Sequence, residues 1–335
     1  LIFNSRGGNI YLWDATTPLT RAVALEDLAG AQSAPTVAAR VLVSERDRHT
    51  IAFGCDPEFD PGVQDPLTIR FANQESYTEW RTLETTTAGE LRVSAGSKIV
   101  TAVQTKQQIL VLTDVSAHAM QYIGAPFTFG LTPLSSNISV AGPNAAVAAG
   151  DVVYWMGLGE FYSYAGQVMQ IDCTVKDYVF SNINRNQIEK AVGGHNGAFG
   201  EVWWFYPSAS SQQNDRYVVY NYMQDVWYYG ALNRSAWVDR GVFPYPLAVD
   251  SSGNMYTHEF GISDGSENPP TGIGAFIQSS PMDMGDGDKY MFGRRLIPDI
   301  TFRSSTGSPS ATFTIQALNF PGGLPFGDYP TDGMR

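Results

Sequence analysis

Four acidic residues stand at the ends of apolar, strand-like runs and are the side chains of this sequence best suited to acid–base chemistry: Asp151, Glu160, Glu201 and Glu259. Two carboxylates on either side of a glycosidic bond can act as general acid and as nucleophile or base. If these acids converge on one face of a β-fold, the chain has the groups for glycan hydrolysis. Sialidase-like propellers carry S-x-D-x-G-x-x-W boxes, and the nearest match, Ser251–Tyr256, lacks both the Asp and the Trp.

The four histidines give little further support to an enzyme: His49, His118, His195 and His258 are scattered, without metal-ligand spacing. His258 could orient the neighbouring Glu259 as a general base, but a satisfied structural pair at a strand end is the favoured interpretation of the two residues. The sequence contains no P-loop, dinucleotide fingerprint, nucleophile elbow or H-E-x-x-H motif. We therefore expect no catalytic residues, no cofactor and no metal.

Three aspartates, Asp283, Asp286 and Asp288, lie in an acidic, glycine-rich turn. Clustered carboxylates attract hard cations, but an EF-type calcium loop needs a Glu at its twelfth position. Counted from Asp283, that position holds Arg294. A solvated turn and a calcium site of another type remain the two interpretations.

The composition makes a broad nucleic-acid surface improbable. The 33 acidic residues exceed the 21 Lys and Arg and give a net charge of -12, and basic residues are not clustered. Sequence-specific DNA binding is therefore not expected. An acidic wall would nevertheless suit a conduit, because it repels the DNA backbone and keeps DNA from adhering.

Cys55 and Cys173 are too few for a disulfide framework and are expected to be buried thiols in a chain folded in a reducing compartment. No run approaches the 18 or so apolar residues of a membrane span, so membrane insertion is not expected. The chain begins at Leu1 without Met, and we expect further sequence at its ends.

The elements that must position these side chains are predicted to be short antiparallel strands. Gly 33, Pro 19, Tyr 17, Phe 18 and Trp 7, with 16% charged residues, favour an all-β chain over long amphipathic helices. The strand-like runs, too many for one simple sandwich, are Asn9–Trp13, Ala39–Val43, Thr50–Gly54, Leu67–Phe71, Ile99–Val103, Gln108–Thr113, Ala119–Ile123, Asp151–Met156, Phe161–Tyr164, Val168–Ile171, Glu201–Tyr206, Tyr217–Tyr222, Val226–Tyr229, Met255–His258 and Ala311–Gln316.

A hairpin-rich unit recurs three times, in Lys98–Gly124, Ala145–Ile171 and Lys190–Gly230. Its length, roughly 40 to 50 residues, is that of a four-stranded propeller blade. The third copy is somewhat similar to a kelch blade, with a Gly193-Gly194 doublet and a Trp227 that could wedge against the next blade. Ordinary aromatic packing is the alternative interpretation. We predict a β-propeller-like body of four-stranded blades.

We expect three regions along the chain. Flanking strands occupy residues 1–34, the propeller-like body residues 35–275, and a β or irregular segment, expected to be incomplete, residues 276–335.

Several sequence segments, which follow one another in the same order, resemble the tail nozzle proteins of short-tailed bacteriophages. These are also called tail tubular or tail hub proteins. The resemblance runs from about Asp56 to Gly261, and more faintly to Asp299. The phrases are DPLTIRFANQESYTEW (Asp65–Trp80), ILVLTDVSAHAMQYIGAPFTFG (Ile109–Gly130), VYWMGLGEFYSYAG (Val153–Gly166), EVWWFYPS (Glu201–Ser208), DRYVVYNYMQDVWYYG (Asp215–Gly230) and HEFG (His258–Gly261).

The resemblance implies a structural, non-enzymatic virion component assembled in the bacterial host cytoplasm. Such proteins form a homohexameric ring below the portal and adaptor rings, enclose the channel through which double-stranded DNA leaves, and support tail fibres or spikes. Asp283, Asp286 and Asp288 are then candidates for an acidic loop that lines the channel. A glycan-binding or glycan-hydrolysing propeller and a kelch-like protein-interaction scaffold are the alternative functions.

Overall fold

A computed structural model describes residues 1–16, 20–263, 268–269, 272–279, 282, 292, 294–302 and 310–318. The chain divides into two compact units, Leu1–Gly261 and Ile262–Arg335. The strands expected before residue 35 form a sheet of their own within the first unit. Asp283, Asp286 and Asp288 lie outside the described residues.

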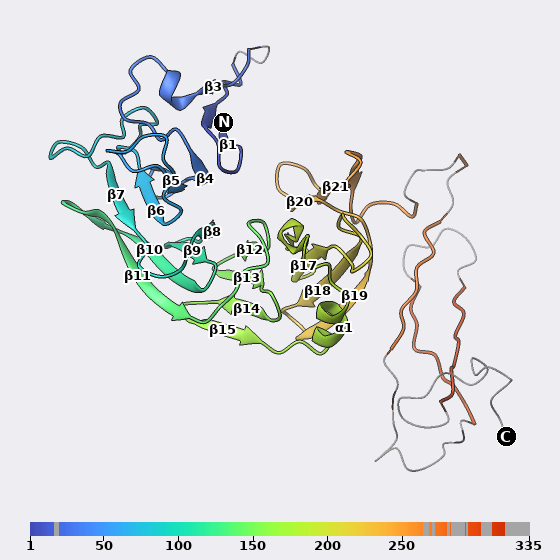
Figure 1. Cartoon of the computed structure of the whole chain (residues 1–335). Helices are drawn as coiled ribbons and strands as arrows, with labels where there is room; N and C mark the ends of the chain where they lie inside the picture. The colour runs from blue at the N-terminus through green and yellow to red at the C-terminus, as the bar shows by residue number, and fades with distance from the viewer. Residues whose placement is uncertain are drawn as a thin grey trace. The chain divides into compact units, whose positions relative to one another are not determined.

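The unit Leu1–Gly261 is a six-bladed β-propeller built from antiparallel sheets that follow one another in chain order, as the colours of Figure 1 show. This confirms the predicted all-β fold with four-stranded blades. Four sheets have four strands, and the first and last have three. The first sheet contains β1 (Ile2–Asn4), β2 (Ile10–Leu12) and β3 (Val23–Ala24), and the second β4 (Ala38–Val43), β5 (Thr50–Cys55), β6 (Thr68–Phe71) and β7 (Gly89–Arg92).

The remaining four sheets complete the propeller. The third sheet contains β8 (Ile99–Gln104), β9 (Ile109–Thr113), β10 (Ser116–Gly124) and β11 (Thr128–Ser136), and the fourth β12 (Ala146–Ala149), β13 (Val152–Met156), β14 (Phe161–Tyr164) and β15 (Val168–Ile171). The fifth contains β16 (Val192–Asn196), β17 (Glu201–Tyr206), β18 (Arg216–Asn221) and β19 (Val226–Ala231), and the last β20 (Ala236–Val238), β21 (Leu247–Val249) and β22 (Met255–Thr257). Helical segments are short: η1 (Leu25–Asp27), α1 (Lys176–Ser181) and η2 (Ile188–Lys190).

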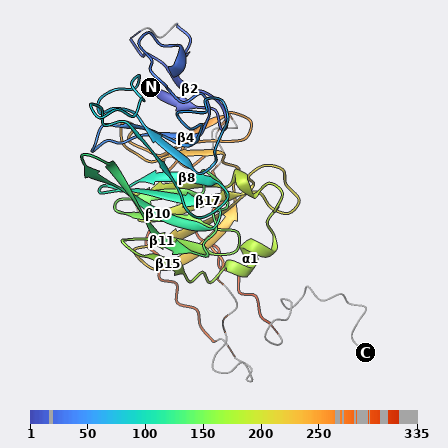
Figure 2. The same cartoon turned by 60° about the vertical axis from the view of Figure 1, so that its left-hand side comes forward.

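The first strand of each sheet lies next to the first strand of the following sheet. β1 contacts β4, and contacts continue in the same way through β8, β12 and β16 to β20. A view turned by 60° shows the sheets one behind another (Figure 2). Each blade is one meander of consecutive strands, so the residues of a blade are close together in the sequence. For this reason the blades appear as a repeat in the amino-acid sequence. The three repeats predicted from sequence correspond to strands of the third, fourth and fifth sheets.

Four apolar cores fill the first four junctions between adjacent sheets. In the core between the fourth and fifth sheets, Phe161 lies 5.0 Å from Trp204 and 4.8 Å from Trp227, measured between ring centroids. The Trp227 indole also donates a hydrogen bond to the Asp172 carbonyl, 2.9 Å away. Trp227 thus joins two blades, but it packs on the preceding blade and not on the next one.

Some elements differ from those expected. Ala311–Gln316, predicted as a strand, has no strand assignment. The predicted runs do not include β1, β3, β7, β11, β12, β16, β20 and β21. β7 and β11 mix Gly, Pro or charged residues with few apolar ones, and β1, β3, β20 and β21 have only two or three residues, too few to show an alternation. β12 and β16 lie within two of the predicted repeats. Cys55 is buried as expected, whereas Cys173 is partly exposed, and both are free thiols. Among the residues that the structure describes, no helix has the length and apolar character needed to cross a bilayer.

Candidate functional site

The junction between the fifth and last sheets differs from the other four because it is polar and aromatic. Two of the four acids singled out from the sequence meet there. Glu201 begins β17, and Glu259 lies just after β22. Asn196, the last residue of β16 and the register partner of Glu201, lies between them. Its Nδ2 is 3.4 Å from Glu201 Oε2 and 3.2 Å from Glu259 Oε1.

Glu201 is held by further donors from its own sheet. The Tyr228 hydroxyl donates to Glu201 Oε1 at 2.6 Å, and the Trp203 indole N–H donates to Oε2 at 3.1 Å. These donors fix the position of the Glu201 carboxyl group. Burial and the hydrogen bond to this carboxylate raise the pKa of Tyr228, so the phenol remains a donor.

Glu259 is the more weakly held carboxylate. Desolvation of its carboxyl, followed by repulsion from Glu201, raises its pKa, while the Asn196 bond acts in the opposite sense. The residue as a whole is exposed, and its φ of 58° is uncommon for a residue other than glycine. The two carboxylates therefore lie close together with one shared amide donor.

A second polar group lies in the same junction around His195 of β16. Its Nδ1 is 3.0 Å from an Asp239 carboxylate oxygen, and its Nε2 is 3.1 Å from the Tyr222 hydroxyl. The His195 carbonyl accepts a 2.8 Å hydrogen bond from the Trp237 indole. The contacts with Trp237 and Asp239 join β16 to β20 and to the loop that follows β20.

His258 has a structural role, which was one of the two interpretations of this residue made from the sequence. Its Nε2 accepts a 2.9 Å hydrogen bond from Arg234 Nε, and the Arg234 guanidinium lies 4.2 Å from the centre of the Tyr256 ring. Burial and the nearby guanidinium lower the pKa of His258 to about 4. His258 is thus a neutral acceptor, and it orients Arg234 and not Glu259.

Trp237 connects the two polar groups. Its ring stacks on Trp203 at a centroid distance of 5.7 Å and lies 4.8 Å from His258. Gly194 leaves room for it, since a Cβ there would lie 2.6 Å from Trp237 Cγ. The sequence singled out the Gly193-Gly194 doublet but not its partner, which lies in another blade.

The other two acids are elsewhere and have basic partners. Asp151 pairs with Lys106 at 3.2 Å, and Glu160 with Lys176 at 2.8 Å. The hypothesis that all four acids converge is therefore wrong, and two of them meet. Among the described residues, no group of three or more His, Cys, Asp or Glu side chains is placed to hold a metal ion.

A serine and a histidine lie beside a hollow of about 440 Å³ in the third sheet. Ser116 Oγ is 2.9 Å from His118 Nε2, but it is also within hydrogen-bond distance of the Thr113 hydroxyl and the Ala95 carbonyl. Both residues are buried. A nucleophile needs a base that is itself oriented by a third group, and the described contacts of this pair include no carboxylate.

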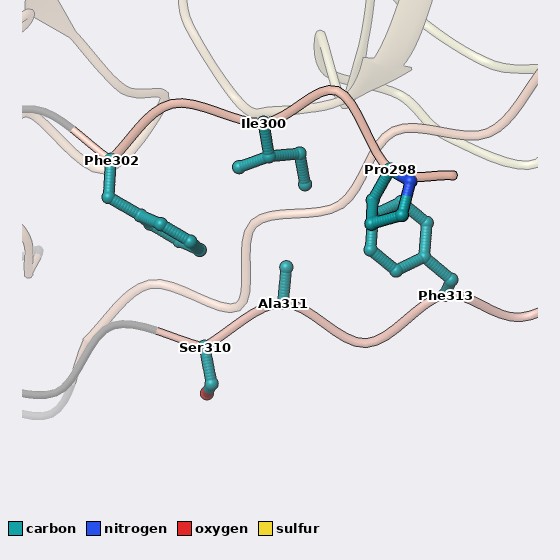
Figure 3. Close-up of a pocket in the computed structure, with 6 residues that line it drawn as sticks. All are labelled: Pro298, Ile300, Phe302, Ser310, Ala311 and Phe313. Carbon is teal, nitrogen blue, oxygen red and sulfur yellow. The ribbon is translucent and has the colours of Figure 1, made fainter. Parts of the chain in front are cut away.

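A second hollow, of about 320 Å³, lies within the unit Ile262–Arg335. Pro298, Ile300 and Phe302 project from one extended segment toward the facing segment with Ala311 and Phe313 (Figure 3). The described residues of its lining are apolar except for Ser310.

Comparisons with known proteins identify no family for the chain. No family model matches the chain, and no curated protein matches it. Among solved structures, Kluyvelomyces marxianus Hsv2 is similar with 9% identity and a TM-score of 0.44, over 76% of this chain and 70% of that one. Kluyveromyces lactis Hsv2 has 10% identity and a TM-score of 0.43, over 76% and 69%. The AfRom2 CNH domain has 13% identity and a TM-score of 0.42, over 77% of each chain. Similarity at this level carries no inference about function.

Proposed function

We propose that this chain is a structural subunit of the tail nozzle of a short-tailed bacteriophage. In this role it forms a homohexameric ring below the portal and adaptor rings, encloses the channel for double-stranded DNA and supports tail fibres or spikes. The role is structural and not enzymatic. The observation that carries the proposal is the ordered set of nozzle-like phrases between Asp56 and Gly261.

The placement of those phrases supports the proposal. They fall on the second to fifth sheets and on the residues that follow β22. The stronger part of the resemblance ends at Gly261, where the propeller unit also ends. The resemblance thus follows a folded unit and not an arbitrary stretch of sequence.

The surface of the last sheet supports assembly through this end of the propeller. Its segment carries six exposed large apolar side chains: Val238, Val242, Phe243, Tyr245, Met255 and Phe260. Exposed apolar side chains are candidates for interaction surfaces, and two of these, Tyr245 and Phe260, lie 5.0 Å apart between ring centroids. A closed ring joins unlike surfaces of neighbouring copies, and we assign this segment to one side of that contact.

The net charge of -12 is compatible with a wall that DNA passes without adhering. The prediction from the sequence is that an acidic loop lines the channel and contains Asp283, Asp286 and Asp288. Replacing all three with Lys should slow DNA ejection from assembled particles or trap the DNA. Unchanged ejection kinetics would make them an ordinary turn.

The location of the chain in a virion tests the proposed function. An antibody against the purified full chain, applied with gold label to phage particles, should mark the tail below the head. Label that is absent from particles, or present only on the head, would overturn the proposal.

A glycan-hydrolysing role is less well supported by the geometry. The Asn196 amide group lies between the two carboxylates, and Glu201 is occupied by donors from Tyr228 and Trp203. A glycosidase needs both carboxylates directed at a substrate. A hydrolysis assay on a glycan array should therefore detect no cleavage.

A further inference from the structure

We propose that residues 310–317 form a β-strand with a neighbouring copy of this chain, by pairing with residues 294–302 of that copy. The inference rests on the homohexameric ring of the proposed function and identifies one of its contacts. Both segments belong to the unit Ile262–Arg335. The sequence predicts a strand at Ala311–Gln316, whereas the single chain has no strand assignment there. Pairing with another copy supplies the partner that this strand lacks.

The sequence of the segment has the period of a strand with one apolar face. Thr312, Thr314 and Gln316 are polar, and the residues between them, Phe313 and Ile315, are apolar. Successive side chains of a strand point to opposite faces, so this alternation separates an apolar face from a polar one. Threonine, isoleucine and phenylalanine are also residues that favour strands. The segment therefore has the composition of a strand that is covered on one side only.

The backbone of both segments is free to pair in the single chain. All described residues in 294–302 and 310–317 are exposed, and no backbone–backbone hydrogen bond joins them to other described residues. Backbone N–H and C=O groups of ordered chains are normally paired, and an open strand edge is a template for pairing with another chain. The two segments therefore offer edges to which a strand of another copy can add.

The two segments face each other through side chains and not through their edges. Ile300 and Phe302 project toward the segment that carries Ala311 and Phe313, across the hollow of about 320 Å³ (Figure 3). Large apolar side chains stay exposed in this arrangement: Phe302 and Phe313 are each 49% exposed, and Ile315 is 77% exposed. Exposed apolar surface of this kind is a candidate for interaction, and added strands would extend the apolar face.

Charge favours another copy as the partner. Each copy has a net charge of -12, so copies repel one another over most of their surface. The sequence from Ser304 to Gly327 has no charged residue, and contact between copies is least opposed there. The other segment begins with Arg294 and Arg295, which attract a neighbour of negative charge. A closed ring needs two unlike surfaces on each copy, and these two segments are such a pair.

Hydrogen exchange of the full chain tests the pairing. In the dilute monomer, the amides of residues 310–317 should exchange at the rate of an unstructured peptide. In the assembled fraction they should exchange more slowly by about tenfold or more, because strand hydrogen bonds protect amides. The loop around Phe59 is the internal reference and should exchange equally in both fractions. Equal exchange of residues 310–317 in both fractions, or protection already present in the monomer, would overturn the proposal.

Proline substitutions test whether the backbone makes the contact. Adjacent strand residues direct their N–H groups to opposite edges, so either Thr314→Pro or Ile315→Pro must remove a bond of the intermolecular ladder. At least one of them should lower the assembled fraction about tenfold in analytical ultracentrifugation, because proline is excluded from paired strand positions. The melting temperature of the monomer should not change, since neither residue has a backbone partner among the described residues.

Thr314→Val and Ile315→Val are the matched controls for the proline variants. Each keeps the N–H group and a β-branched side chain, so both should assemble like the unchanged chain. Normal assembly of both proline variants would overturn the proposal.

Failure of this inference can be told from failure of the proposed function. Sixfold rings in electron microscopy whose residues 310–317 stay unprotected would overturn the strand pairing and leave the ring intact. Protection of this segment in open fibres would support the pairing and contradict the ring.

Discussion

Buried polar side chains without partners are the clearest destabilising features at the level of single residues. His49 is 0% exposed, and neither of its ring nitrogens has a hydrogen-bond partner among the described residues. Its ring lies 5.2 Å from the Phe129 ring and 6.3 Å from the Phe71 ring. Burial lowers the pKa of His49, although Asp47 acts in the opposite sense. The His49 ring therefore packs among aromatic rings, in a position that an apolar aromatic side chain could fill.

His49→Phe should stabilise the chain by about 1 to 2 kcal/mol, because it replaces two unsatisfied buried nitrogens with apolar carbon. Chemical denaturation measures the change in free energy of unfolding. His195→Phe is the matched control and should destabilise, since His195 has partners in Asp239 and Tyr222. Lower stability of His49→Phe would show that the nitrogens are satisfied.

His258 predicts how stability depends on pH. Its pKa is about 4 in the folded chain against 6.5 in the unfolded chain. Between these values the unfolded state binds more protons, so the free energy of unfolding falls as the pH is lowered from 6.5 to 4. The loss should be on the order of 2 kcal/mol, once partial exposure of the ring is allowed for.

His258→Gln provides the control for this pH dependence. Its amide oxygen can still accept from Arg234 but does not titrate, so the variant should show a flatter stability profile between pH 6.5 and 4. Thermal melts across this range measure both profiles. Parallel profiles for the two proteins would exclude His258 as the cause.

At the level of elements, Trp237 supplies the aromatic packing between the last sheet and the fifth. Trp237 packs directly on Gly194 of β16 and stacks on Trp203. This junction has no apolar core like the four between the earlier sheets, as far as the described residues show. Attachment of the last sheet should therefore be sensitive to changes at this contact.

Gly194→Ala should destabilise the chain by about 1 to 3 kcal/mol, the usual cost of an overpacked position. The added Cβ would lie 2.6 Å from Trp237 Cγ. Gly241→Ala is the control, since a Cβ there meets open space. Hydrogen exchange should show faster exchange in β20–β22 for Gly194→Ala alone, and equal protection in both variants would contradict this account.

The strands were largely predictable from sequence, whereas the polar junction was not. Runs such as Glu201–Tyr206 are strongly apolar and aromatic, so their composition predicts a strand. The contact between Asn196 and Glu259 joins residues 63 positions apart. No local pattern fixes which two of four strand-end acids meet, because the stacking of blades decides it. Glu201 and Glu259 were candidates, while Asn196 gave no signal apart from its position in a predicted repeat.

At the scale of the whole molecule, the exposed apolar residues of the last sheet should decide assembly. Val242 is 99% exposed, so a charge there should leave folding intact and disrupt a contact between copies. Val242→Asp should reduce the assembled fraction at least tenfold in analytical ultracentrifugation. Phe59→Asp, at a residue 94% exposed in the loop between β5 and β6, is the control and should still assemble. Full assembly of Val242→Asp would place the interface elsewhere.

The central claim is that six copies of this propeller-containing chain close into a ring around a DNA channel. Electron microscopy of the purified full chain and its assemblies tests it most directly. The account predicts sixfold rings with an open central channel. A monomer under all assembly conditions, or a ring with no channel, would contradict it.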